Sequence, residues 1–135
     1  MRSLLYQAVA AIPAFGGRVY QASATGVGDV PQSPDKPFCV IREIGSTTYP
    51  VVEETASPRA RSFYFWVYDE RGSYVRIDEL LKEVGDTVRD LVGSVSPSGR
   101  RCIGVNWQGE SMDLEDDTYD ANAKYGSARV TQGTL

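Results

Sequence analysis

The chain has no histidine among its 135 residues. Histidine is the commonest general base and the usual partner of a serine or cysteine nucleophile, so its absence removes the most frequent routes to hydrolytic catalysis. The sequence also lacks a GxSxG elbow, a Walker loop and an HExxH motif. We therefore expect no enzymatic activity and no cofactor.

Cysteine is scarce, with only Cys39 and Cys102 in the chain. Both lie in apolar runs typical of strands, PFCVI and RCIGV, where a free cysteine packs as a small hydrophobic residue. A disulfide would require the two strands to pair, and the sequence leaves that open. Two cysteines at this separation, without histidine, do not form a zinc site.

Long apolar runs are missing too. The N-terminal run LLYQAVAAI is far shorter than the roughly 18 residues that span a bilayer, and no convincing cleavage region follows it. We expect no membrane association and a cytoplasm-like compartment. The net charge of −4 disfavours nucleic-acid binding as the main task, because an acidic protein does not attract phosphates through its overall field.

The composition that remains is that of an ordinary globular protein. The hydrophobic fraction is 41% and the charged fraction is 24%. A chain of this length buries roughly two thirds of its unfolded surface, which is enough for one core. We therefore predict a single domain over residues 1–135.

Two helices are predicted from apolar periodicity. Residues 74–92 repeat apolar side chains at i, i+3, i+4 and i+7, with charged residues on the opposite side. Ser73 is a plausible N-cap, and Gly93 suits the position after the helix. A shorter helix is predicted over residues 3–12, where Pro13 and the following glycines end it.

Strands are predicted over 18–21, 38–44, 60–68, 100–108 and 125–132. Segment 60–68 is aromatic on both faces, which favours a central strand with a helix on one side. Residues 22–37 are predicted to form a long loop. Because Pro50 cannot donate a backbone hydrogen bond within a sheet, residues 45–59 are predicted to form an edge strand or an extended arm. The predicted fold class is α+β, with an antiparallel sheet of about four to five strands packed by one long helix and a short N-terminal helix.

Only one group of residues in the sequence, an acidic segment, could supply the side chains of a metal-binding or catalytic site. Its carboxylates offer hard oxygen ligands for calcium or magnesium, but their spacing does not fit an EF-hand. Paired carboxylates for glycoside hydrolysis would need a cleft, which a sequence cannot show. A solvated loop or contact surface is favoured, and like charges this dense should keep it extended unless countered. The residues are Asp113, Glu115, Asp116, Asp117 and Asp120.

Aromatic and basic residues suggest contact surfaces. Tyr64, Trp66, Tyr68 and Trp107 could stack bases or ligands, but beside a long helix such residues more often belong to a core or an interface. The arginines are dispersed and could pair with acids of an adjacent copy or of the same chain. The candidate subunit-interface residues are Tyr49, Val51, Arg59, Arg61, Arg100 and Arg101.

The order of segments adds a resemblance. A short helix precedes GGRVY, a loop ends in KPFCVI, and the aromatic strand FYFWVYDE leads through RGSY into the helix IDELLKEVGDTVRDLV. A strand ending in VNWQGESMDLED follows. This order resembles the tail terminator family of long-tailed bacteriophages over most of the chain. It is a pattern of elements rather than a catalytic signature.

The resemblance implies a compact α+β fold and a homohexameric ring in the virion, assembled in the host cytoplasm. Such a ring caps the tail tube, stops polymerisation of the major tail protein and meets the head-completion or stopper protein. DNA passes through its lumen without specific binding, and the acidic segment is a candidate lining. The alternatives are another head–tail connector or stopper, or a small domain that binds a divalent cation or other ligand.

Overall fold

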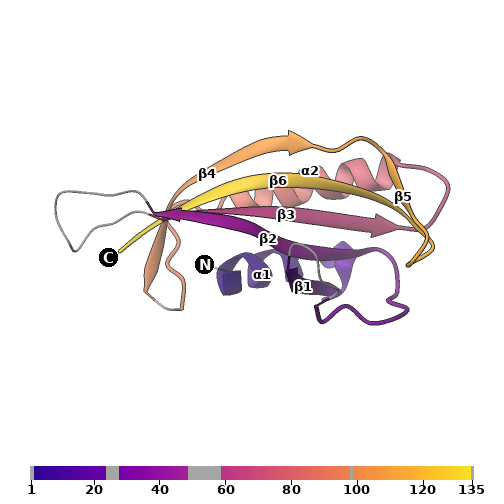
Figure 1. Cartoon of the computed structure of the whole chain (residues 1–135), viewed down its shortest axis with the longest axis horizontal. Helices are drawn as coiled ribbons and strands as arrows, with labels where there is room; N and C mark the ends of the chain where they lie inside the picture. The colour runs from indigo at the N-terminus through magenta and orange to yellow at the C-terminus, as the bar shows by residue number, and fades with distance from the viewer. Residues whose placement is uncertain (1, 24–27, 49–58, 98, 135) are drawn as a thin grey trace.

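The computed structural model describes residues 2–23, 28–48, 59–97 and 99–134, and it has an α+β fold (Figure 1). The predicted fold class is therefore confirmed. The elements in chain order are α1 (Arg2–Ala10), the 3-10 turn η1 (Pro13–Phe15), β1 (Val19–Ser23), β2 (Phe38–Thr48), β3 (Arg59–Asp69), α2 (Val75–Arg89), β4 (Arg100–Glu110), β5 (Leu114–Asp116) and β6 (Ala121–Thr134).

Six strands form one mixed sheet, slightly more than predicted. The strand order is β1-β2-β3-β6-β4, and β5 pairs with the start of β6 beside β4. All pairs are antiparallel except β1 with β2. A parallel pair needs a connection that returns to the same end of the sheet, which accounts for the long segment between these two strands.

The two helices cover one face of the sheet and enclose the main core. Phe63 and Phe65 of β3 meet Leu81 and Val84 of α2 there, and all four are fully buried. Figure 1 shows α2 behind β3 and β6, running along them. The apolar stripe therefore packs as predicted from Ile77 to Val88, whereas the helix ends at Arg89 and Val92 is 52% exposed.

The opposite face carries a smaller aromatic cluster and no helix of the described residues. Phe38 stacks on Tyr68 with ring centroids 4.6 Å apart, and Tyr119 meets both rings edge-on. Val30, from the segment between β1 and β2, packs against this cluster. The prediction that 60–68 is a central, two-faced strand is confirmed, because β3 lies between β2 and β6.

β6 is longer than the predicted strand 125–132 and is flanked on both sides. Its apolar pattern is weak because small residues face the helix side. A Cβ added at Gly126 would lie 2.2 Å from Cζ2 of Trp107, so the indole of β4 fills the space that a larger side chain would occupy. Neighbouring Ala128 is fully buried.

Cys39 and Cys102 are both free thiols in the core. Their strands, β2 and β4, are separated by β3 and β6, so the pairing that a disulfide required does not occur. Of the helices in the described ranges, none is long and apolar enough to cross a membrane.

Candidate functional site

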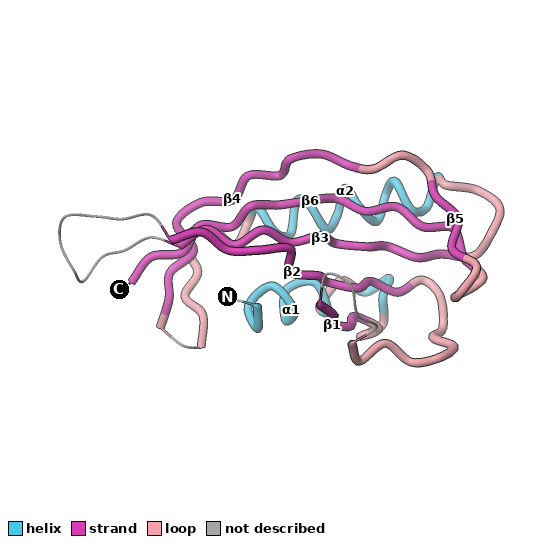
Figure 2. The backbone as a smooth tube through the Cα atoms, viewed as in Figure 1, coloured by secondary structure: helices cyan, strands magenta, loops and turns pink. Residues whose placement is uncertain are grey.

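The two ends of the sheet differ in charge. β3 runs toward the end at which β5 lies and β6 begins, whereas β4 begins at the opposite end, where β6 finishes (Figure 2). We call the first the acidic end, because it holds Asp113, Glu115, Asp116, Asp117 and Asp120. We call the second the arginine end, because it holds Arg59, Arg61, Arg100 and Arg101.

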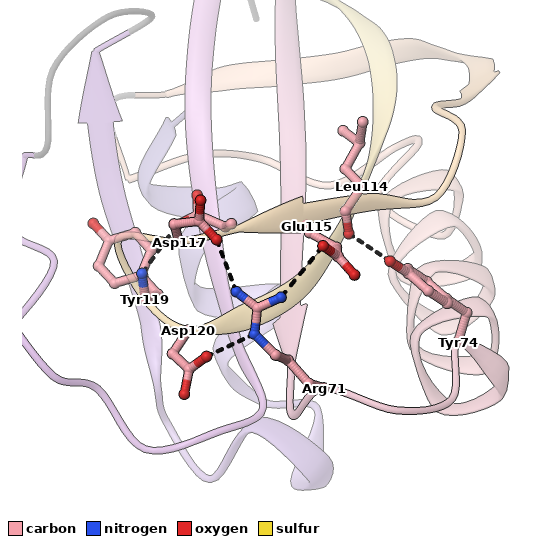
Figure 3. Close-up of polar contacts among 8 residues, drawn as sticks. Arg71, Tyr74, Leu114, Glu115, Asp117, Tyr119 and Asp120 are labelled. Carbon is pink, nitrogen blue, oxygen red and sulfur yellow. Dashed lines mark hydrogen bonds and ion pairs between the residues drawn. The ribbon is translucent and has the colours of Figure 1, made fainter.

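Arg71 organises the acidic end. It lies in the turn between β3 and α2, and its guanidinium points into the acidic segment (Figure 3). Nε is 2.6 Å from Oδ1 of Asp120, Nη2 is 2.9 Å from Oδ1 of Asp117, and Nη1 is 3.4 Å from Oε2 of Glu115. One planar cation thus gathers three of the five predicted carboxylates.

These contacts are exposed to solvent. The side chains of Asp117 and Asp120 are 99% and 83% exposed, and that of Arg71 is 36% exposed. The hydrogen bond from Arg71 holds the pKa of the Asp120 carboxyl below its usual range. The same carboxylates raise the pKa of Arg71, led by Asp120. Three carboxylates surround this one guanidinium, so the group keeps a net negative formal charge.

The other two predicted carboxylates make different contacts. Asp113 lies 3.5 Å from Nζ of Lys124, which also bonds Asp78 of α2 at 2.8 Å. Oδ1 of Asp116 accepts a hydrogen bond from the Tyr119 amide at 3.0 Å and so closes the turn before β6. The five residues therefore share one end of the sheet but do not form one cluster.

Local contacts fix the backbone of the acidic segment, while its carboxylates stay exposed to solvent as expected. The Tyr74 hydroxyl donates to the Leu114 carbonyl at 2.7 Å, which ties the start of α2 to β5 (Figure 3). Asp120 has φ 49°, a left-handed conformation that aspartate tolerates better than most side chains. The expected repulsion is countered by Arg71 and Lys124.

The arrangement leaves little capacity for a cation. The carboxylates around Arg71 already accept hydrogen bonds from its guanidinium. Across the part of the chain that the structure describes, no three histidine, cysteine, aspartate or glutamate side chains are placed to hold a metal ion together.

At the arginine end, the predicted interface residues differ in their roles. Arg59 and Arg100 flank the end of β6, opposite Gln132 and Thr134. Arg101 donates to the Gly93 carbonyl at 3.0 Å. Tyr49 and Val51 lie outside the described residues.

Arg61 makes its ion pair inside the chain. It donates two hydrogen bonds to Glu43, at 2.8 and 2.6 Å, and Arg2 of α1 contacts the same carboxylate. The bond from Arg61 is the main cause that lowers the pKa of Glu43. This cluster attaches α1 to the sheet, so Arg61 has a structural role within the chain.

Sequence reasoning missed the place of Arg71 in this site. It counted Arg71 among dispersed basic residues, and Asp120 lies 49 positions further along the chain. Only the pairing of β3 with β6 brings the two together, through partners such as Asp69 and Asn122. One feature of the sequence indicates this position. Arg71 and Gly72 lie in the turn directly after β3, and β6, the neighbour of β3, begins beside that turn.

Comparison with known proteins identifies a structural neighbour but no family. No family model and no curated protein matches the chain. A chain from a solved structure described as "Virion of native gene transfer agent (GTA) particle" shares the fold, with a TM-score of 0.65 and 17% identity. The match covers 98% of this chain and 94% of the other, so the likeness extends over the whole fold.

Proposed function

We propose that this chain is a structural protein of a phage-like virion, and specifically a tail terminator. The observation that carries the proposal is the whole-length likeness to a chain of a gene transfer agent virion. The more specific part of the proposal is supported by the order of segments from GGRVY to VNWQGESMDLED, which resembles that of the tail terminator family. In this proposal one domain of 135 residues forms a homohexameric ring that caps the tail tube and ends its polymerisation.

The charge distribution supports a ring subunit. A ring turns different surfaces of each subunit toward its lumen and toward neighbouring proteins, so these surfaces should differ in character. This chain separates an acidic end from an arginine end along the same strands. We further propose that Arg59, Arg100 and Arg101 contribute to contacts with a neighbouring virion protein, whereas Arg61 acts within the subunit.

The acidic end is the proposed lining of the lumen. Its most exposed carboxylates, on Asp117 and Asp120, would repel DNA phosphates. A negative wall lets DNA pass without binding, as a tail channel requires. No reaction or cofactor is part of this role.

The proposal is tested by oligomeric state and partner choice. Purified protein should form rings of about six subunits by light scattering and negative-stain imaging. It should bind the end of a tube of the major tail protein and then the head-completion or stopper protein. Binding to the head side alone would indicate another connector or stopper. A monomer stabilised against heat by calcium or magnesium would indicate a ligand-binding domain instead.

A further inference from the structure

A short hairpin extends from the sheet at the arginine end, between α2 and β4 (Figure 1). We call it the end hairpin and define it by residues 93–97 and 99–102. The Gly93 amide donates a hydrogen bond to the Cys102 carbonyl at 2.7 Å, and the Cys102 amide donates to the Ser94 carbonyl at 2.8 Å. These bonds hold the backbone of the hairpin in one arrangement, so the side chains on its outer side are already positioned for a contact.

The outer side of this hairpin presents two apolar side chains beside an arginine. Val95 lies directly opposite Arg101, so their side chains share one side of the hairpin. Arg101 in turn lies opposite Gly133 of β6, and an added Cβ at Gly133 would be 3.6 Å from Cγ2 of Ile103, which places Ile103 on that side too. All three side chains are exposed. We call Val95, Arg101 and Ile103 the end patch.

The end patch is basic as well as apolar. The Arg101 guanidinium donates to the Gly93 carbonyl at 3.0 Å, which is a neutral partner and leaves the positive charge uncompensated. Among the described residues, no carboxylate forms an ion pair with Arg101 or with the preceding Arg100. A surface of this kind fits a partner that combines an apolar side chain with carboxylates.

The other end of β4 leads into a segment of that description. Met112, in the connection between β4 and β5, is 77% exposed, the highest value for a large apolar side chain in the described part of the chain. Its backbone is held by Ser111, whose hydroxyl donates to the Met112 carbonyl at 2.8 Å and accepts from the Tyr125 amide at 3.0 Å. Because a methionine side chain adapts to irregular apolar surfaces, Met112 suits a contact with the end patch.

Carboxylates flank Met112. Glu110 is exposed and lies beyond ion-pair distance of Lys124, the cation on which it acts. Asp113 lies 3.5 Å from Nζ of Lys124, but the same ammonium also bonds Asp78 at 2.8 Å. One ammonium thus faces three carboxylates, and the group keeps a net negative formal charge. We call Glu110, Met112 and Asp113 the acidic knob.

We propose that the acidic knob of one copy docks on the end patch of a second copy. Met112 would cover Val95 and Ile103, while Arg101 would meet Glu110, so the two surfaces match in both apolar character and charge. Because they lie at opposite ends of β4, the contact is head-to-tail and can close into a ring. The inference rests on the proposed ring and names the surfaces that build it.

The contact is compatible with the rest of the proposed ring. Asp117 and Asp120 lie in the turn between β5 and β6, outside the acidic knob, and stay free to face the lumen. Strand pairing along the outer edge of β4 is a poorer candidate for the contact. Register shifts after Cys102 and after Trp107 interrupt the row of backbone groups that another strand would need.

The test reverses the charge on each surface. Arg101→Glu and Glu110→Arg should each lose the ring in light scattering, because like charges would then meet across the contact. Combining both changes in one chain should restore the ring, since the exchanged charges again meet with opposite sign. Thermal melting by circular dichroism verifies that each variant is folded. Lys82→Glu makes the same charge change as Arg101→Glu at an exposed position of α2, outside both surfaces, and should leave the ring intact.

Met112→Asp tests the apolar part of the contact and should also lose the ring, while its exposed position leaves the fold intact. Rings that persist in Met112→Asp and in both single charge variants would overturn the inference but leave the ring itself standing. A folded double charge variant that stays monomeric would overturn it as well. A monomeric wild-type protein would overturn both the inference and the ring. Rings of Arg101→Glu that no longer bind tubes of the major tail protein would assign the end patch to that protein, and would also overturn the inference.

Discussion

Arg71 contacts carboxylates on β5 and on the turn before β6, and so links the β3–α2 turn to a distant segment. Exposed ion pairs of this kind individually contribute little to stability, because water and salt screen them. Their effect is geometric: the planar guanidinium holds Glu115, Asp117 and Asp120 in one arrangement. The charge presented by the acidic end is therefore ordered, not diffuse.

Replacing Arg71 should change the titration of Asp120. In the native protein the pKa of Asp120 is lowered from its ordinary value of 3.8, chiefly by the hydrogen bond from Arg71. The resulting stabilisation is present above that value and is lost as the pH falls through the lowered pKa. In Arg71→Ala, NMR titration should show the pKa of Asp120 rising toward 3.8. Arg71→Lys, which keeps the positive charge without the planar guanidinium, should give a smaller rise in the pKa of Asp120. An unchanged pKa in Arg71→Ala contradicts this account.

Leu81 tests the main core. It is fully buried on α2 against the sheet. Leu81→Ala should lower the free energy of unfolding by about 2–5 kcal/mol, because it removes buried methyl groups and leaves a cavity. Val75→Ala is the matched control, since Val75 lies on the same helix with 64% of its surface exposed. Urea denaturation measures both, and equal losses would show that α2 is not packed as described.

At the scale of elements, the indole of Trp107 on β4 fills the space between β4, β6 and α2. Trp107 lies over Gly126 of β6 and against Gly85 of α2, where an added Cβ would be 3.2 Å from its ring. Phe65 and the guanidinium of Arg89 also approach the ring, each at 5.8 Å. The two glycines allow strand, helix and indole to meet in one layer.

Gly126→Ala should therefore displace Trp107. The new methyl group would lie 2.2 Å from the ring, which is too close for any real contact. We expect a loss of roughly 1–3 kcal/mol in unfolding free energy, as for overpacked cores. Gly133→Ala on the same strand is the control, because its Cβ would be 3.6 Å from Ile103, an ordinary contact. A neutral Gly126→Ala variant would mean that Trp107 is free to move aside.

The sequence predicts elements well where one residue pattern decides them. The stripe of α2 and the alternation of β3 depend on local spacing, and both are confirmed. β6 was predicted too short because Ala121, Asn122 and Ala123 have little preference for strands and are buried only through their pairing with β3 and β5. β5 was not predicted, because an acidic run forms a strand only when β6 and Arg71 are already in place.

At the scale of the whole molecule, the two charged ends are too far apart to influence each other. β6 has 14 residues, and at about 3.3 Å per residue it spans roughly 45 Å. That is several times the Debye length of about 8 Å at physiological salt. The separation of charge therefore bears on contacts with other molecules and not on the stability of the chain itself.

Charge reversal at the acidic end tests the proposed lumen lining. Lysine at Asp117 and Asp120 would replace a repulsive wall with one that binds phosphates, so assembled particles should deliver DNA slowly or stall. Glu83→Lys, at an exposed position on α2 away from the acidic end, is the control. Infectivity and DNA release are the measurements. Unchanged infectivity in particles that contain the lysine variant would reject the lining.

The proposed function is that this chain ends tail growth. The most direct measurement is the length of tubes formed by the major tail protein, imaged by negative stain with and without the purified chain. We predict that added chain stops elongation, so that tubes shorten as its concentration rises and carry a ring at one end. Tubes of unchanged length, with no ring on either end, would contradict the claim.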